Sequence, residues 1–190
     1  MAEGGTLHDR LIAPYKQQLL ADLRGDVLEI GPGAGANFQY YPADIRWVGL
    51  EPNPYMEKYL RAAAKGREIV LHMGYSEALP VANESMDAVV TTLVLCSVRD
   101  LARTLAEIRR VLRPGGKYLF IEHVAAPQGS GLRRWQNWIT PLLGFFADGC
   151  HPNREVWQAL EEADFSQLEI TRFTLDVPIV KPHIAGVAIK

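Results

Sequence analysis

An apolar run followed by a glycine-rich turn, at residues 27–35, constrains the fold of this chain more than any other stretch. Residues 27–30 are Val-Leu-Glu-Ile, which is typical of a short buried strand in a parallel sheet. Gly31, Gly33 and Gly35 follow at the spacing of a tight turn. Glycine permits positive φ angles and lets backbone N–H groups approach a bound molecule, so we expect the strand to end in a ligand-binding turn.

Two acidic residues beside this turn indicate the chemistry of its ligand. Glu51 ends a second apolar run, at residues 47–50, and follows Gly31 at the roughly twenty-residue spacing at which an acid binds ribose hydroxyls. Glu29 stands just before the first glycine, where a carboxylate favours a positively charged ligand over a pyrophosphate. The sequence therefore predicts a cationic nucleoside as the ligand.

At these residues the chain resembles the class I S-adenosylmethionine-dependent methyltransferases. The resemblance implies a Rossmann-like fold, S-adenosylmethionine as the cofactor and S-adenosylhomocysteine as the product. It implies that the glycine turn holds the methionyl part, that Glu29 orders the turn or binds the amino group through water, and that Glu51 binds the ribose. A turn that only packs a helix against a sheet is the alternative. The full set of residues expected at the cofactor is Tyr15, Glu29, Gly31, Gly33, Gly35, Asn37, Glu51, Pro52, Asn53, Gly74, Tyr75, Ser76, Glu77 and Leu93.

The composition limits the class of protein. A length of 190 residues fits one domain, so we expect a single methyltransferase domain over residues 1–190. The hydrophobic share of 48% is that of a soluble globular protein, and a net charge of −2 offers no basic surface for nucleic acid. Two cysteines fit a reducing compartment, and residues 1–23 contain no apolar run suited to a signal peptide or a membrane span. These features predict a cytoplasmic protein that acts on a small molecule.

Strand-like and helix-like segments alternate along the chain, which predicts an α/β fold with a doubly wound, mostly parallel sheet. The resemblance implies seven strands, of which the last is antiparallel. We expect strands at 27–30, 46–51, 69–73, 85–90, 117–122, 168–175 and 184–189, and helices at 7–23, 37–41, 55–65, 101–112 and 154–163. Ligands bind beyond the carboxyl ends of such strands, where the sequence places Gly35, Glu51, Gly74, Leu93 and His123.

Residues 1–24 are expected to form an N-terminal helical cap over the cofactor site, divided at Pro14. Tyr15 contacts the cofactor carboxylate from this cap or packs in the core, and its position on the helix fits both interpretations.

The loop after the third strand departs from the family pattern. The family commonly has Gly-Asp-Ala-Glu there, with the acid beside the adenine amino group, whereas this chain has Gly74-Tyr75-Ser76-Glu77. The adenine contact then falls to Ser76, Glu77 or the backbone, and Tyr75 stacks on the base.

Residues 127–152 lie outside the alternating pattern and are rich in large apolar side chains. We expect this segment to be an acceptor lid over a lipophilic pocket, because the fold itself does not require it. The residues expected to contact the substrate are Cys96, Trp135, Trp138 and Phe146. A core helix explains the same apolar face equally well. Peripheral contact with a membrane is a third interpretation, because Arg133 and Arg134 stand beside tryptophans.

From the glycine turn onward, the chain more closely resembles the methyltransferase-like 7 family of alkyl thiol methyltransferases. The matching stretches are residues 35–38, 51–54, 92–98, 109–116, 122–125 and 148–150, and they include Leu-Cys-Ser-Val and Glu-His-Val-Ala. The resemblance implies a small lipophilic thiol as the acceptor. The N-terminal hydrophobic anchor of that family has no counterpart in this sequence, so we expect no stable membrane insertion.

Methylation of a thiol requires the thiolate and an in-line approach to the methyl group. His123 is the first candidate for the base, because the pKa of a histidine lies near working pH, and Asp148 and His151 are the next. A hydrogen-bonded histidine at a strand end is the alternative for His123. We expect no metal, because Cys150 and His151 lack the spacing of a zinc site.

Two other functions stay open at this point. The same fold supports methylation of a lipid head-group amine or a quinone ring, and it also supports a non-catalytic protein that only binds S-adenosylmethionine.

Overall fold

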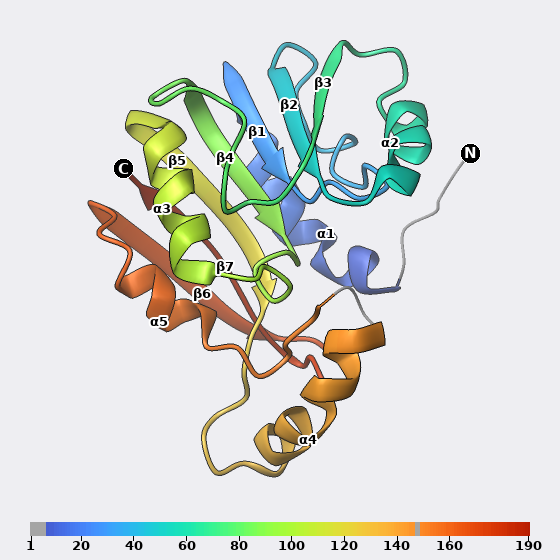
Figure 1. The fold of residues 1–190 in the computed structure, drawn as a ribbon, viewed down its shortest axis with the longest axis vertical. Coiled ribbons are helices and arrows are strands. Elements are labelled where there is room, and N and C mark those ends of the chain that lie inside the picture. The colour runs from blue at the N-terminus through green and yellow to red at the C-terminus, as the bar shows by residue number, and fades with distance from the viewer. Residues whose placement is uncertain (1–6, 147–148) are drawn as a thin grey trace.

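The apolar segments of the sequence form one sheet in the computed structural model, which describes residues 7–146 and 149–190 (Figure 1). Its strands are β1 (Asp26–Ile30), β2 (Arg46–Glu51), β3 (Ile69–Met73), β4 (Met86–Thr92), β5 (Leu112–His123), β6 (Gln167–Thr174) and β7 (Pro182–Ile189). Their order across the sheet is β3-β2-β1-β4-β5-β7-β6. The pairs among β1 to β5 are parallel, and β7 runs antiparallel to both β5 and β6. The predicted doubly wound, mostly parallel sheet with an antiparallel last strand is confirmed.

Helices cover both faces of this sheet (Figure 1). They are α1 (Leu7–Leu20), the 3-10 turn η1 (Pro54–Met56), α2 (Glu57–Ala63), α3 (Leu101–Val111), α4 (Gly131–Phe146) and α5 (Val156–Glu161). Over the described ranges, none of these helices has both the length and the apolarity required to cross a bilayer.

The core lies in two layers because neighbouring side chains of a strand point to opposite faces of the sheet. Phe120 of β5 packs in the layer that contains Ile108 of α3 and Leu160 of α5. Leu119, one residue earlier on β5, packs in the layer that contains Leu20 of α1 and α2 residue Leu60. The parallel strands end at one edge of the sheet, and α4 lies beyond that edge (Figure 1). This edge is where the sequence places the ligand.

The N-terminal helix is not divided at Pro14. The proline lies inside the continuous helix α1, at an exposed position. A proline removes the hydrogen bond to the carbonyl four residues earlier, here that of Arg10, which is also an exposed residue. The expected break in the helix is therefore wrong.

The segment after the glycine turn is also not the helix that we expected at residues 37–41. It consists of successive four-residue turns, in which Phe38 N–H donates to Gly35 O at 3.2 Å and Tyr40 N–H donates to Asn37 O at 2.9 Å. Five residues before a proline are too few for a stable helical nucleus. In addition, the Asn37 side chain is held beneath the turn by Glu29.

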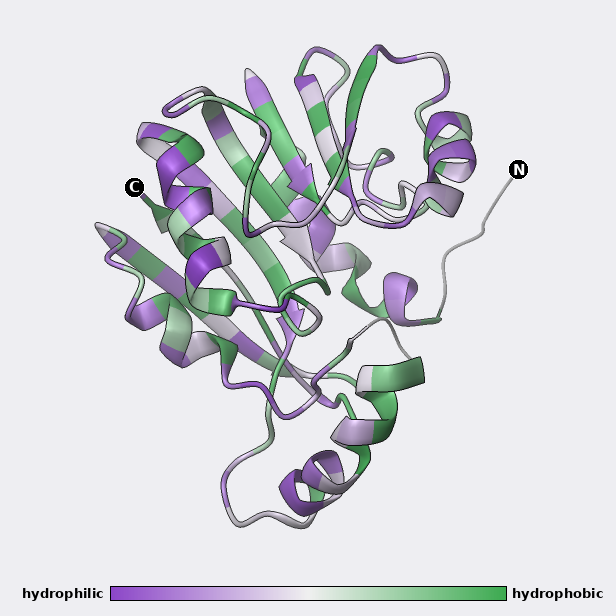
Figure 2. Cartoon of the chain, viewed as in Figure 1, coloured by the Kyte–Doolittle hydropathy of each residue, from purple (hydrophilic) through white to green (hydrophobic). Residues whose placement is uncertain are grey.

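Helix α4 buries polar side chains and exposes apolar ones, which is the reverse of a core helix. Its buried residues are Arg133 and Gln136, whereas Trp138, Phe145 and Phe146 have 69%, 80% and 74% of their surface exposed. Figure 2 shows its C-terminal half as hydrophobic. The core-helix interpretation of residues 127–152 is therefore wrong, since the apolar side of the helix is not packed in the core.

Candidate functional site

The glycine turn has the backbone geometry that the sequence predicts. Gly31, Gly33 and Gly35 have φ angles of +64°, +53° and +82°. A Cβ atom on Gly31 would lie 2.7 Å from a methyl group of Val94, so the turn fits closely against the loop that follows β4. A Cβ on Gly33 would meet nothing within 4 Å. Gly33 therefore borders open space, which a ligand can occupy.

Glu51 joins the glycine turn to the loop that follows β2. Its Oε2 accepts a hydrogen bond from Gly33 N–H at 2.9 Å, and its Oε1 accepts one from Asn53 N–H at 2.9 Å. Asn53 in turn uses its side-chain oxygen to cap η1 through Tyr55 N–H. A carboxylate offers about four lone-pair positions, so Glu51 retains acceptor capacity for two ribose hydroxyls.

Glu29 lies beneath the turn and not in the open space. It is 2% exposed and accepts hydrogen bonds from Asn37 Nδ2 at 2.8 Å and Trp47 Nε1 at 3.0 Å. Burial raises the pKa of this carboxyl. The same Asn37 nitrogen also donates to the Thr92 hydroxyl at 3.1 Å, which ties the turn to the end of β4. Glu29 therefore orders the turn, the first of the two roles that the resemblance implies.

The side chains of the loop after β3 are engaged with α3. The Ser76 hydroxyl lies 2.8 Å from that of Thr104, and Glu77 Oε1 accepts the N–H groups of Arg99 and Asp100 just before the helix. The Tyr75 ring is half exposed, with the Arg99 guanidinium 4.1 Å from its centre. The Glu77 carbonyl is engaged too, because it accepts a hydrogen bond from Arg103 Nε at 2.8 Å. The adenine contact of this loop therefore stays a prediction, with the half-exposed Tyr75 ring as the accessible candidate.

A buried carboxylate, which sequence reasoning missed, shapes the loop after β4. Glu122 is fully buried, and its Oε2 accepts hydrogen bonds from Val94 N–H at 2.9 Å and Leu95 N–H at 3.0 Å. Burial raises the pKa of Glu122 well above its ordinary value. Leu93, at the start of this loop, has a φ angle of +58°. The signal in the sequence was an acid inside an apolar strand, where burial requires partners.

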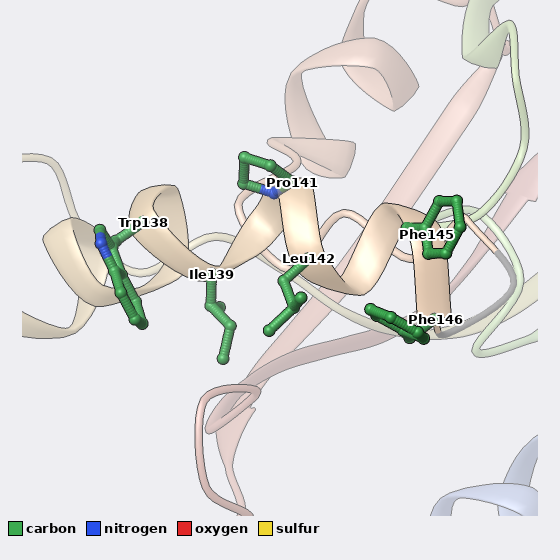
Figure 3. Close-up of a pocket in the computed structure, with 6 residues that line it drawn as sticks. All are labelled: Trp138, Ile139, Pro141, Leu142, Phe145 and Phe146. Carbon is green, nitrogen blue, oxygen red and sulfur yellow. The ribbon is translucent and has the colours of Figure 1, made fainter.

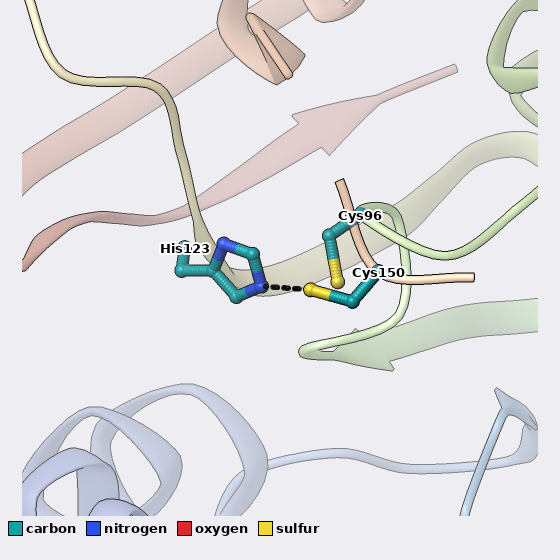
Figure 4. Close-up of side chains that lie close together, drawn as sticks. All are labelled: Cys96, His123 and Cys150. Carbon is teal, nitrogen blue, oxygen red and sulfur yellow. Dashed lines mark hydrogen bonds between the residues drawn. The ribbon is translucent and has the colours of Figure 1, made fainter. Parts of the chain in front are cut away.

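Cys96, His123 and Cys150 come together at the carboxyl ends of β4 and β5, and we call them the Cys-His-Cys cluster (Figure 4). Their ligand atoms lie within 4.8 Å of one another, and His123 Nε2 is 3.5 Å from Cys150 Sγ. Cys96 and His123 are 3% and 5% exposed. The hydrogen bond to Cys150 and burial raise the pKa of Cys96 to about 12, whereas the hydrogen bond from Cys96 lowers the pKa of Cys150. Cys150 is therefore the thiol that ionises first.

Comparison with known proteins identifies the family of this chain. A methyltransferase-domain model matches residues 28–120. Thiol S-methyltransferase TMT1B of Homo sapiens is 40% identical, over 96% of this chain and 81% of the relative, and thiol S-methyltransferase TMT1A of the same species is 38% identical, over 97% and 82%. The chain belongs to the TMT1 family. A solved S-adenosylmethionine-dependent methyltransferase from Mesorhizobium loti has the same fold, with a TM-score of 0.69 and 18% identity over 94% of this chain and 97% of that one.

Membership of the TMT1 family confirms the enzyme class and the cofactor that the resemblance implied. The protein is an S-adenosylmethionine-dependent methyltransferase. The structure brings the glycine turn, Glu51, Asn53 and Gly74 together at one edge of the sheet. Glu51 links them, because its side chain accepts Gly33 N–H and Asn53 N–H, and its carbonyl accepts Gly74 N–H at 3.4 Å. Pro52 lies between two of these residues.

The other predicted site residues, Tyr15, His151 and Asp148, are not shown to belong to the cofactor or acceptor site. The Tyr15 ring stacks on Phe173 of β6, with the ring centres 3.8 Å apart. Tyr15 therefore packs against the sheet, and its contact with the cofactor stays a prediction. His151 Nδ1 is 2.6 Å from Gly149 O, and its backbone N–H donates to Cys96 O, so His151 positions the loop. Asp148 lies outside the described residues.

The predicted substrate contacts on α4 form an exposed apolar surface. Trp135 and Trp138 stack with their ring centres 4.9 Å apart. Trp138, Ile139, Leu142 and Phe146 project from one side of the helix and border an open hollow of about 590 Å³ (Figure 3). The side chains that anchor the helix are polar, because Gln136 accepts Ala126 N–H and donates to Ile179 O at 2.8 Å each.

Proposed function

We propose that this TMT1-family enzyme methylates the sulfur atom of a small lipophilic thiol. The observation that carries the proposal is the similarity to two human proteins named thiol S-methyltransferases, which extends over more than four fifths of their length. The exposed apolar side of α4 supports a lipophilic acceptor, since it offers aromatic and aliphatic contacts.

The reaction is a direct displacement at carbon. The thiol loses its proton, the thiolate sulfur forms a bond to the methyl carbon, and the bond from that carbon to the sulfonium sulfur breaks. The products are a thioether, S-adenosylhomocysteine and one proton. The protein aligns the two sulfur atoms and excludes water, which accounts for much of the rate in such reactions.

His123 and its cluster support the removal of the thiol proton. His123 ends β5, and the loop after β4 that carries Cys96 also carries Val94, the residue that contacts the glycine turn. His123 Nδ1 is buried and has no hydrogen-bond partner in the part of the chain that the structure describes. The cluster therefore supplies polar side chains close to the cofactor turn, where the acceptor thiol must approach.

The test is turnover with a panel of lipophilic thiols, amines and quinols, with the methylated product identified by mass spectrometry. We expect thioethers from the thiols alone. Methylation of an amine or a quinol without thiol turnover would overturn the thiol assignment. Binding of S-adenosylmethionine without any turnover would favour a non-catalytic role.

A further inference from the structure

We propose that Cys96, His123 and Cys150 bind a zinc ion, and that the acceptor thiol occupies the fourth position on this ion. The inference deepens the proposed function and rests on it for the identity of the acceptor. The binding of the metal itself rests only on the geometry of the three side chains.

The ligand set suits a soft divalent metal. The cluster offers two sulfur atoms and one imidazole nitrogen, all within 4.8 Å of one another. Zinc binds such donors well, whereas hard cations bind oxygen ligands instead. For zinc bonds of about 2.3 Å to sulfur and about 2.05 Å to nitrogen, a tetrahedral angle places the two ligand atoms about 3.6 Å apart. The distance from His123 Nε2 to Cys150 Sγ is 3.5 Å, so this pair needs little movement to bind the ion (Figure 4).

The cluster is held in place by the surrounding backbone. Arg154 Nη1 donates to Leu95 O at 2.6 Å and to Val98 O at 2.7 Å, which fixes the loop on either side of Cys96. His151 N–H donates to Cys96 O at 2.9 Å, which joins this loop to the segment that carries Cys150. Preorganised ligands of this kind lower the cost of binding a metal ion.

Three protein ligands leave one position open on a tetrahedral ion, as in catalytic zinc sites. Cys150 is the partly exposed member of the cluster, and the loop that carries Cys96 also carries Val94, which lies against Gly31 of the cofactor turn. A thiol that binds the ion there loses its proton to solvent, because a bound zinc ion stabilises the thiolate. Its sulfur then forms the bond to the methyl carbon while the sulfonium bond breaks, and the neutral thioether leaves the metal.

The first experiment uses the wild-type protein, whose only two cysteines are the two in the cluster. The reduced and chelator-treated protein is titrated with zinc, and free thiols are counted with an aromatic disulfide reagent. We expect one zinc ion per chain and loss of reactivity at both thiols, reversed by a chelator. Cobalt in place of zinc should give thiolate-to-metal charge-transfer absorption.

Single variants test the assignment of the ligands. We expect zinc binding to weaken at least about 100-fold in each of the variants Cys96→Ser, Cys150→Ser and His123→Asn. Loss of a residue that only hydrogen-bonds to a metal ligand weakens binding by up to about 100-fold, and loss of a ligand should cost at least as much. His72→Gln on β3 is the matched control and should bind zinc as the wild type does. Circular dichroism of each variant shows whether it is folded.

Three results would overturn the proposal: no zinc uptake by the reduced protein, thiols that stay reactive with zinc present, or unchanged zinc affinity in both cysteine variants. A disulfide that forms in air, in a protein that takes up no zinc after reduction, would identify a redox pair instead. Zinc binding at the cluster without thiol turnover would refute the thiol function and leave the metal site intact. Equal thiol turnover with and without metal would refute the role of the metal in methyl transfer and leave the function intact.

Discussion

Each glycine of the turn has its own physical constraint. Gly31 and Gly35 are confined by neighbouring atoms, because a Cβ would lie 2.7 Å from Val94 in the first case and 2.8 Å from Ala63 in the second. Gly33 has only the positive φ angle and the open space beside it. Packing therefore accounts for Gly31 and Gly35, whereas for Gly33 we predict a role at the ligand.

Gly33→Ala should therefore weaken the binding of S-adenosylhomocysteine more than it lowers stability, since the new methyl group enters the ligand space. The matched control is Gly66→Ala, which also has a positive φ angle, +81°, and no atoms within 4 Å. Both changes should cost about 1 kcal/mol of folding stability through backbone strain. Calorimetry should show reduced affinity for Gly33→Ala alone, and equal affinities in the two variants would exclude Gly33 from the site.

Glu51→Ala should weaken cofactor binding by about 1–3 kcal/mol, because the ribose loses a charged hydrogen-bond partner and Gly33 N–H loses its acceptor. Titration of the variant with S-adenosylhomocysteine measures this loss. An unchanged dissociation constant would show that the carboxylate only shapes the turn.

Glu29 should make folding stability depend on pH in a defined direction. Its pKa is higher in the folded chain than its ordinary value of 4.5, so the folded state favours the protonated form. Stability is then fully present below about pH 4.5 and decreases as the pH rises through the folded pKa. Glu29→Gln removes this decrease but leaves the donor of Asn37 or Trp47 without an acceptor, at a cost of about 1–3 kcal/mol.

Denaturant unfolding at about pH 5 and about pH 8 measures the effect. The stability difference between wild type and Glu29→Gln should be smaller at the higher pH. A constant difference would contradict a raised pKa for this carboxyl.

His123→Asn should slow methylation most for thiols of high pKa. An acidic thiol is already ionised and needs no help, whereas a weakly acidic thiol should lose a factor of about 100 or more. Rates for a series of thiols of graded pKa at one pH test this. The same loss for every thiol would limit His123 to a positioning role.

At the scale of the element, the strands could be predicted closely from the sequence and the site only in part. The expected bounds 46–51 and 69–73 coincide with β2 and β3, because buried strands show as short apolar runs between turn residues. The short segment after the glycine turn was predicted as a helix, since its residues alone do not show that Asn37 bonds to Glu29. The Cys-His-Cys cluster could not be predicted, because its three residues lie far apart in the sequence. His123 ends β5, Cys96 lies in the loop after β4, and Cys150 lies between α4 and α5, and only the fold brings them together.

Helix α4 should control the acceptor and leave the cofactor alone. Replacing Trp138 or Phe146 by alanine should raise the acceptor KM roughly five- to thirtyfold, the equivalent of about 1–2 kcal/mol of lost contact. Because both side chains are mostly exposed, folding stability should change by only about 0.5 kcal/mol. Steady-state kinetics and thermal unfolding check the two parts. A fall in cofactor affinity of the same size as the rise in KM would contradict this division.

At the scale of the whole molecule, the donor and acceptor halves of the site are built differently. The donor half consists of glycine backbone and buried carboxylates at the ends of β1 and β2. The acceptor half that we propose combines the cluster with α4, which lies beyond the edge of the sheet (Figure 1). A cytoplasmic location and a peripheral contact of α4 with membranes stay predictions, and fractionation of cells that produce the protein would test both.

The inward polar side of α4 has a consequence for how such enzymes diversify. Gln136 and Arg133 fasten the helix through hydrogen bonds to backbone and an ion pair to Glu155, so its outer side chains contribute little to holding the fold together. With the acceptor role that we propose for α4, mutations there are exposed to selection for what the enzyme methylates and are largely spared selection for folding. On this proposal, a lineage can change its range of acceptors by substitutions on one helix surface while its methyl-donor chemistry is inherited unaltered.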